Sequence, residues 1–227
     1  MIVITGASRG IGNFLFNSFL QNSEETVIGI YLNTLPVEKI ENFVKLDVCN
    51  YDQIQNFVQL RSIELKEITL VNCAGINYNA FAHKSDPEKW KNIVETNLFG
   101  TYNFIRALLP LMREQKFGRI INFSSVVAIK PTPGISPYAA SKSALWGLSK
   151  SIAIENAAFN ITVNNINLGY SELGMIEMVP DEFKKNIIAQ IPAGILCQPM
   201  DILNTVNYLR TTRYITGSSI DLSGGLV

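Results

Sequence analysis

A glycine-rich turn between the first expected strand and the first expected helix limits the fold more than any other feature of the chain. The short apolar strand Ile2–Thr5 runs directly into Gly6-Ala-Ser-Arg-Gly-Ile-Gly12, and a helical pattern follows over Ile11–Gln21. Glycine is needed there because the turn is tight and a pyrophosphate must approach bare backbone, while the helix N-terminus offers unpaired N–H groups. The segment therefore predicts a phosphate-binding loop. The expected contacts are Gly6, Ser8, Arg9, Gly10, Ile11 and Gly12.

Strand-like and helix-like patterns alternate along the rest of the chain. Further strands are expected at 26–32, 43–46, 68–72, 119–123, 161–166 and 219–222. Helices are expected at 51–64, 86–113, 137–157, 181–190 and 200–209. This alternation indicates βαβ units, so we expect an α/β fold with a doubly wound Rossmann-type parallel sheet, flanked by helices, in one domain spanning 1–227. The irregular stretch after the strand at 161–166 follows a carboxyl end of the sheet, and we expect a substrate lid at about 169–195.

Composition excludes several classes of function. The chain carries 19 basic and 19 acidic side chains, so its net charge is zero and nothing indicates a nucleic-acid or membrane partner. No apolar stretch approaches the roughly 20 residues that span a bilayer, and the first residues do not resemble a signal peptide, so we expect a cytoplasmic protein. Three scattered cysteines (Cys49, Cys73 and Cys197) and a single histidine (His83) favour free thiols and no metal site.

The end of the second expected strand bears on which dinucleotide binds. A protein that binds an unphosphorylated dinucleotide usually places Asp or Glu there for the ribose hydroxyls, but this chain has Tyr31-Leu-Asn33. Arg9 in the glycine loop can bind a 2′-phosphate through charge-assisted hydrogen bonds. We therefore expect NADP(H) rather than NAD(H), with Asn33 among the cofactor contacts. The alternative for Arg9 is a solvated loop charge.

Tyr138 and Lys142 lie four residues apart on an expected helix, which places both side chains on one face. A nearby ammonium favours the phenolate, so we expect Lys142 to lower the pKa of Tyr138 and make it a general acid and base. Ser124 and Ser125 end the preceding strand, where a hydroxyl can stabilise charge on a substrate oxygen. Tyrosine and lysine at this spacing are common by chance, and the pair alone is weak evidence.

Taken together, these segments resemble the short-chain dehydrogenase/reductase family over essentially the whole chain. The segments that carry the resemblance are Thr5–Gly12, Asp47-Val48, Asn72-Cys-Ala-Gly75, Asn97, Ser125, Tyr138-Ala-Ala-Ser-Lys142 and Tyr214-Ile-Thr-Gly217. The resemblance implies hydride transfer between a nicotinamide cofactor and a carbonyl or secondary alcohol, with Ser125, Tyr138 and Lys142 as the catalytic triad.

The resemblance also implies roles for residues outside the triad. Asn97 would complete a tetrad by kinking its helix and holding a water that relays protons to Lys142. Asp47 and Val48 would border the adenine. The remaining cofactor contacts would be Asn72, Ala74, Gly75, Gly169 and Ser171, besides Tyr138 and Lys142.

Some positions depart from the family pattern, and all of them affect cofactor seating or the lid. Leu168 stands where the family usually has proline, and Leu173 where a threonine commonly holds the nicotinamide amide, although Ser171 lies nearby. Cys73 replaces an asparagine, and Ile195 replaces a basic residue. These changes bear on nicotinamide affinity and substrate identity more than on the reaction type.

Within the family the chain looks most like the 3-oxoacyl-[acyl-carrier-protein] reductases, in its segments Ile188–Gly194 and Tyr214–Gly225. That resemblance implies an acidic carrier protein that docks on basic residues beside the active-site entrance. Lys116 keeps one of these charges, but Phe159 loses the other, so we expect docking to be weakened or absent. The alternatives are the same chemistry on another small molecule, such as a sugar, polyol or secondary-metabolite intermediate, and a cofactor-binding protein without turnover.

The resemblance further implies a homotetramer, with a homodimer as the smaller alternative. The expected helix 137–157 has apolar residues on more than one side, among them Leu145, Trp146, Leu148 and Ile152. A helix buried between its own sheet and a partner subunit would show this pattern, but burial within one subunit remains the alternative.

Overall fold

Seven parallel strands in the described residues form one sheet, in the order β3-β2-β1-β4-β5-β6-β7. This computed structural model describes residues 1–22, 25–34, 39–174, 176 and 179–227. The strands are β1 (Ile2–Thr5), β2 (Val27–Tyr31), β3 (Phe43–Lys45), β4 (Thr69–Asn72), β5 (Gly118–Ser125), β6 (Ile161–Leu168) and β7 (Ser219–Leu222). The strand order reverses direction between β1 and β4, and a crevice for ligands opens at such a point in a doubly wound sheet.

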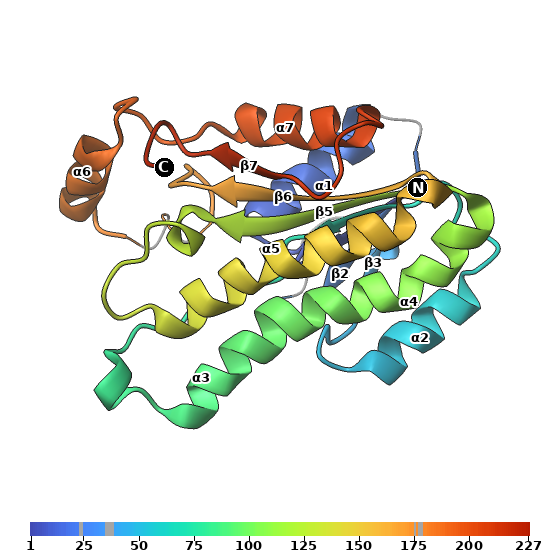
Figure 1. The fold of residues 1–227 in the computed structure, drawn as a ribbon, viewed down its shortest axis with the longest axis horizontal. Helices are drawn as coiled ribbons and strands as arrows, with labels where there is room; N and C mark the ends of the chain where they lie inside the picture. Colours follow the sequence, from blue (N-terminus) through green and yellow to red (C-terminus); the bar gives the residue numbers. More distant parts are fainter. Residues whose placement is uncertain (23–24, 35–38, 175, 177–178) are drawn as a thin grey trace.

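Helices cover both faces of this sheet. They are α1 (Gly10–Asn22), α2 (Tyr51–Leu60), α3 (Pro87–Val94), α4 (Gly100–Gln115), α5 (Ser136–Asn156), α6 (Asp181–Gln190) and α7 (Pro199–Thr211). Figure 1 shows α2, α4 and α5 on one side of the sheet, α1 and α7 on the other, and α6 at the end toward which the strands point. The expected doubly wound α/β fold is confirmed.

Each face of the sheet has its own apolar core. Phe104, Ile105 and Leu108 of α4 are fully buried in the first cluster, and Leu15 and Phe16 of α1 are fully buried in the second. Burying one such side chain stabilises a fold by roughly 1.5–3 kcal/mol. These two layers hold the strand ends, and the loops that follow them, in a rigid frame.

Local signals in the sequence explain where several helices begin. The Asp86 carboxylate accepts hydrogen bonds from the backbone N–H groups of Glu88 (2.9 Å) and Lys89 (3.3 Å), and Pro87 occupies the first helical position of α3. Asn50 caps α2 in the same way, through Gln53. The prediction that a helix begins at Asp86-Pro87-Glu88 is therefore confirmed.

Four expected elements differ clearly from the structure in their extent. The helix predicted to end at Glu64 ends at Leu60, because the Ser62 hydroxyl bonds to the Gln59 carbonyl and the chain turns. The helix predicted over 86–113 reaches Gln115 and is interrupted by a π-helical turn, η3 (Glu95–Phe99). The strands predicted to end at 123 and 166 continue for two more residues, as β5 and β6, because their polar ends are buried and hydrogen-bonded.

A row of buried polar side chains lies between the sheet and α5. Asn72 donates to Asn122 (2.8 Å), Asn122 to Ser149 (3.0 Å), Ser149 to Asn165 (2.7 Å), and Asn165 to Ser219 (3.0 Å). The row therefore joins β4, β5, α5, β6 and the start of β7. A buried amide is tolerated because its hydrogen bonds replace those it loses to water. Helix α5 thus packs partly against polar side chains of the sheet.

Two absences among the described residues bear on function. No helix found there combines the length and the apolar character needed to cross a membrane. The same residues contain no group of three or more His, Cys, Asp or Glu side chains that could hold a metal ion.

Candidate active site

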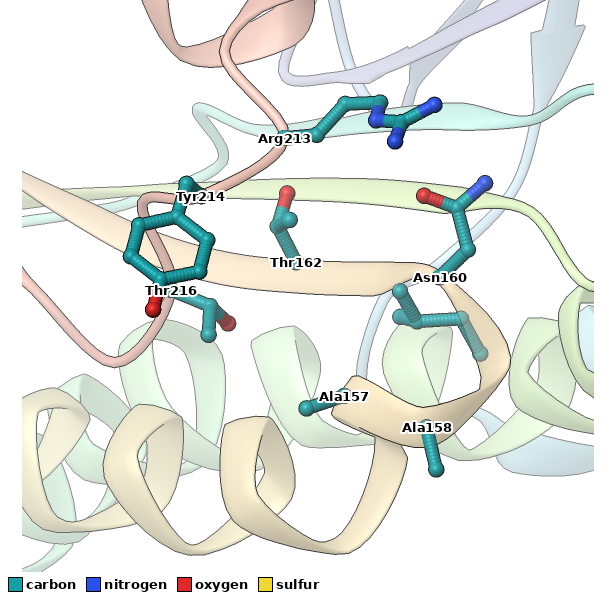
Figure 2. A pocket seen from close by; sticks show the side chains of 8 residues that line it. Ala157, Ala158, Asn160, Thr162, Arg213, Tyr214 and Thr216 are labelled. Atoms are coloured by element: carbon teal, nitrogen blue, oxygen red, sulfur yellow. The ribbon is translucent and has the colours of Figure 1, made fainter.

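A pocket of about 690 Å³ opens at the carboxyl ends of β1, β4, β5 and β6. Among the residues predicted to form the site, its lining contains Arg9, Ile11, Gly75, Ser125, Tyr138, Lys142, Gly169 and Ser171. A second hollow, of about 490 Å³, lies around the start of β6 and is drawn in Figure 2. Its lining includes Asn160, Thr162 and Arg213 but none of the predicted site residues. The first pocket is therefore the candidate active site.

The glycine loop leaves bare backbone where a phosphate would approach. Gly6 has φ +65°, and a Cβ atom there would lie 2.8 Å from the Cα of Ala74. A Cβ atom on Gly12 would lie 2.3 Å from the carbonyl oxygen of Gly6. The loop after β1 is thus pressed against the loop after β4, and the Thr5 hydroxyl accepts a hydrogen bond from the Ala74 N–H at 3.1 Å. Because α1 begins at Gly10, its free N–H groups point toward the same space.

The predicted adenine end lies at the carboxyl ends of β2 and β3, outside the lining of the pocket. Val48 is buried, and its side chain fills the space against Gly100, where a Cβ atom would lie 2.6 Å from Val48 Cγ2. Asp47 accepts a hydrogen bond from the Cys49 N–H at 2.9 Å. Asn33 is exposed beyond β2, and Arg9 is exposed without an ion pair to any described residue.

Helix α5 and strand β5 bring the three predicted catalytic side chains together. The Tyr138 phenol lies close enough to the Ser125 hydroxyl for the serine to lower its pKa. The Lys142 ammonium lies 5.6 Å from the centre of the Tyr138 ring and donates to the Phe123 carbonyl oxygen at 2.6 Å. All three side chains line the pocket, so a substrate oxygen beside Tyr138 would also meet the Ser125 hydroxyl.

The expected effect of Lys142 on Tyr138 is wrong. Burial raises the pKa of Tyr138 to about 12, and the hydrogen bond from Ser125 only partly opposes this rise. Burial also lowers the pKa of Lys142 to about 8, against a smaller opposite effect of the Cys73 thiol. Desolvation disfavours the charged form of both groups and is the largest effect on the pKa of each. At neutral pH, Tyr138 is therefore a proton donor.

Asn97 lies in the π-helical turn η3 and is fully buried. Its amide oxygen accepts from the Ile76 N–H (2.9 Å), and its amide nitrogen donates to the Ile76 carbonyl (3.0 Å) and to the Ser141 hydroxyl (3.1 Å). The side chain thus joins the loop after β4 to α5. A Cβ atom on Gly75 would lie 3.3 Å from the Asn97 amide oxygen and 3.7 Å from the Lys142 ammonium, so these groups crowd one point of the pocket.

Asn72 differs from the other predicted cofactor contacts. Its side chain is buried and donates to Asn122 in the polar row beneath α5, and it is absent from the lining of the pocket. Its amide oxygen is the one buried side-chain oxygen or nitrogen without a partner in the part of the chain that the structure describes. The next residue, Cys73, does line the pocket, and burial raises the pKa of its thiol.

The loop after β6 supplies one wall of the pocket. A short parallel bridge pairs Ser171 with Cys197, and the Ser171 hydroxyl donates to the Leu173 carbonyl at 2.9 Å. Gly169 lies against the backbone of Ser223, where a Cβ atom would approach to 3.1 Å. Within the predicted lid, 169–195, the described residues Tyr170, Leu173, Ile176 and Val179 also line the pocket, whereas 175, 177 and 178 lie outside the described residues.

Sequence reasoning missed most of the substrate side of the pocket. The additional lining residues there are Ile76, Asn77, Asn79, Val126, Val127, Thr132 and Ile135. Each lies in a loop that follows β4 or β5, so the rule that ligands bind beyond the carboxyl ends of strands could have found them. Their residue types alone gave no such signal.

Comparisons with known proteins agree with this geometry. A family model described as short chain dehydrogenase matches residues 1–182. The 3-oxoacyl-[acyl-carrier-protein] reductase FabG of Haemophilus influenzae is 34% identical over 234 residues, covering 99% of this chain and 96% of that protein. FabG of Escherichia coli is 33% identical over 234 residues, with the same coverage. The crystal structure of a 3-oxoacyl-[acyl-carrier protein] reductase from Brucella melitensis has a TM-score of 0.89 and 31% sequence identity, covering 99% of this chain and 90% of that chain.

The contact between Gly6 and Ala74 gives a test of the phosphate loop. Gly6→Ala should weaken the binding of a nicotinamide dinucleotide at least about tenfold, because the new Cβ atom forces the two loops apart and strains a left-handed residue. The matched control is Gly194→Ala, where φ is +70° but a Cβ atom would meet no other atom within 4 Å. Binding is followed by quenching of protein fluorescence. Equal losses in the two variants would show that strain alone, and not the approach to Ala74, limits binding.

Proposed function

The chain belongs to the short-chain dehydrogenase family, and on that premise we propose that it is an NADPH-dependent reductase of 3-oxoacyl thioesters. The observation that carries the proposal is the meeting of Ser125, Tyr138 and Lys142 in one pocket, beside a glycine loop with bare backbone. The relatives described as 3-oxoacyl-[acyl-carrier-protein] reductases support the substrate class.

The residues of the pocket fit a nicotinamide dinucleotide. Gly6 and Gly12 allow the loop after β1 to pack tightly in front of the N-terminus of α1, and Gly75 leaves bare backbone beside Asn97 and Lys142. When bound, such a cofactor supplies the hydride that reduces a carbonyl carbon. We assign the cofactor contacts to the glycine loop, Asp47, Val48, the Ala74–Gly75 backbone, Gly169 and Ser171.

The protein's own residues then handle the substrate oxygen and its proton. Tyr138 donates its phenolic proton to the carbonyl oxygen, and the Ser125 hydroxyl donates a hydrogen bond to the same oxygen as charge develops on it. The Lys142 ammonium, protonated at neutral pH, stabilises the phenolate that Tyr138 leaves behind. Asn97 acts as a positioning residue, because its amide holds Ile76, the neighbour of Gly75, at both backbone groups.

We assign the phosphorylated cofactor on two features. Arg9 is exposed at the mouth of the pocket and is free of ion pairs with the described residues. The positions that follow β2, Leu32, Asn33 and Thr34, carry no carboxylate that would repel a 2′-phosphate. A guanidinium binds phosphate by two parallel hydrogen bonds, which makes Arg9 the selective group.

The substrate side of the pocket is consistent with an acyl chain but also supports a second candidate. Val126, Val127 and Ile135 give it an apolar wall, to which Ile176 and Val179 add from the lid. A polar trio, Asn77, Asn79 and Thr132, lines the same side and favours a more polar carbonyl or alcohol, such as a sugar or polyol. Whether the substrate contacts the apolar wall or the polar trio distinguishes the acyl thioester from the sugar or polyol.

The two positions at which a carrier protein was expected to dock, Lys116 and Phe159, do not lie beside the pocket of the same subunit. Lys116 and Phe159 precede β5 and β6, at the end of the sheet opposite to the pocket, so they do not flank the entrance of their own chain. The missing charge is supplied nearby, because the Arg113 guanidinium stacks on the Phe159 ring at 3.8 Å. We propose that this basic pair serves the entrance of a second copy.

In a symmetric oligomer, the pocket end of one copy would lie beside the opposite, basic end of another. Figure 1 shows α4 and α5 on the same face of the sheet, each running from the pocket end to the opposite end. Ile154 of α5 is 84% exposed and Phe99, just before α4, is 54% exposed, whereas Leu145 and Ile152 are buried within the subunit. A twofold axis between such helices places the far end of one copy beside the pocket of the other. We propose a homotetramer or homodimer of this kind, in the cytoplasm.

Turnover gives the direct test of the proposed function. NADPH should bind more tightly than NADH and be consumed when acetoacetyl-CoA is added, as followed by the absorbance of the reduced nicotinamide. Tyr138→Phe should lower turnover by at least about a thousandfold and leave NADPH affinity within about twofold, since it removes only the proton donor. Binding without consumption of any 3-oxoacyl thioester would contradict the substrate class and favour the polar alternative.

The raised pKa of Tyr138 determines which direction of the reaction depends on pH. Reduction uses the protonated phenol, which predominates far below a pKa of about 12, and a charged Lys142, whose pKa is about 8, so its kcat/KM should stay nearly flat between about pH 5 and 7. Oxidation of the alcohol needs the phenolate, whose fraction rises tenfold per pH unit, so its kcat/KM should rise about tenfold per unit. A reduction rate that instead fell with rising pH would mean that Tyr138 titrates below this range.

Charge reversal at the stacked arginine tests the docking surface. Arg113→Glu should raise the KM for a carrier-protein-linked substrate about tenfold, because an acidic partner would meet a negative charge. The kcat/KM for acetoacetyl-CoA should change less than about twofold. Arg61→Glu, at the end of α2, is the matched control, and size-exclusion chromatography checks that the oligomer persists. Equal effects of Arg113→Glu on both substrates would argue against docking at this place.

A further inference from the structure

Three consecutive residues at the end of β5 contact α5 in different ways. The Phe123 carbonyl accepts from the Lys142 ammonium, and the Ser125 hydroxyl lies close enough to Tyr138 to lower the pKa of its phenol. Between them, the Ser124 hydroxyl donates to the backbone carbonyl of Lys142 at 3.0 Å. Ser124 also lines the pocket, but its hydroxyl hydrogen is already donated to α5, whereas that of Ser125 makes no such bond to the helix backbone.

Trp146 completes this contact from the next turn of α5. Its indole N–H lies 3.2 Å from the Ser124 hydroxyl oxygen and 2.9 Å from the Asn167 amide oxygen, and is shared between them. Asn167, which is 1% exposed on β6, donates in turn to the Asp221 carboxylate on β7 at 2.6 Å. Helix α5 is thus tied to β5, β6 and β7 at one point.

The spacing along α5 connects this point to the site. Tyr138, Lys142 and Trp146 follow one another at intervals of four residues and so lie on one face of the helix. A slide of α5 by a fraction of a turn would part Tyr138 from Ser125 while leaving most apolar contacts intact. The hydrogen bonds among Trp146, Ser124, Asn167 and the Lys142 carbonyl oppose such a slide, because it would leave buried polar groups without partners.

We propose that Trp146, held by Asn167, is a positioning residue that acts through Ser124 to set the register of α5 against β5, and with it the distance from Tyr138 to Ser125. The inference rests on the proposed catalytic role of these two residues. A displacement of about 1 Å at reacting groups can slow an enzyme about a hundredfold, so small changes at Trp146 should appear in kcat rather than in binding.

Replacing each of the two tryptophans of the chain by phenylalanine tests the proposal. Trp146→Phe keeps the ring but removes the N–H, and it should lower kcat for the reduction of acetoacetyl-CoA at least about tenfold, with KM and NADPH affinity within about twofold. Trp90→Phe is the matched control: its indole N–H also donates to a serine hydroxyl, that of Ser136 at 3.3 Å, but at the exposed first residue of α5. It should leave kcat within about twofold.

A second variant and a readout that needs no turnover complete the test. Ser124→Ala removes the same connection from the strand, so the double variant with Trp146→Phe should be no slower than the slower single variant. In both single variants the pKa of Lys142, followed by NMR of labelled lysine and assigned with Lys142→Arg, should rise from about 8 toward its ordinary value as the helix loosens.

Each outcome has a separate meaning. An inactive wild type with an upward shift of the Lys142 pKa in Trp146→Phe would leave the positioning role standing and reject the proposed substrate. An active wild type whose Trp146→Phe variant keeps its kcat and its Lys142 pKa would reject the positioning role alone. Losses that add up in the double variant would also reject it, because they would show that Trp146 and Ser124 act independently.

Discussion

The contact between the end of β5 and one face of α5 is the interaction on which the candidate site depends. Phe123, Ser124 and Ser125 meet Lys142, Trp146 and Tyr138 through side-chain and backbone hydrogen bonds. No other pair of elements in the described residues brings all three proposed catalytic side chains together. The remaining parts of the fold can be understood by what they contribute to this contact: the sheet orients β5, and the loops after β1, β4 and β6 close the space in front of it.

The same burial that orders these groups decides where the proton resides. Desolvation raises the pKa of Tyr138 to about 12 and lowers that of Lys142 to about 8, so both effects oppose a phenolate–ammonium pair. Near pH 7 the Lys142 side chain is still mostly protonated, and Tyr138 carries its proton. An active site in this condition gives a proton to an incoming carbonyl oxygen more readily than it takes one from an alcohol, which agrees with a reductase.

The sequence predicted the fold and much of the site because both depend on local patterns. Alternating strand and helix patterns, the capped start at Asp86 and the glycine loop each follow from neighbouring residues, and the parallel sheet follows from their order. The polar row beneath α5 was not predictable in this way, since Asn72, Asn122 and Asn165 lie far apart in sequence and become partners only in the sheet. The pKa of Tyr138 was mispredicted for a related reason: spacing shows that Lys142 is near, but only the folded structure shows how far both are removed from water.

The polar side chains between α5 and the sheet are better explained by the single register that they impose on α5 than by a contribution to stability. Apolar side chains of similar volume would stabilise a buried helix at least as well as amides, because removing polar groups from water offsets much of what their hydrogen bonds contribute. Apolar surfaces, however, accept several registers of similar energy, whereas a buried polar group left without its partner strongly disfavours the wrong one. Asn122, Ser149 and Asn165 connect the middle of α5 to two strands, and Trp146 and Ser124 connect the turn next to the site. A helix that must present a phenol to a substrate oxygen and an ammonium to that phenol needs a single register along its whole length, and hydrogen-bonded pairs spaced along the helix provide it.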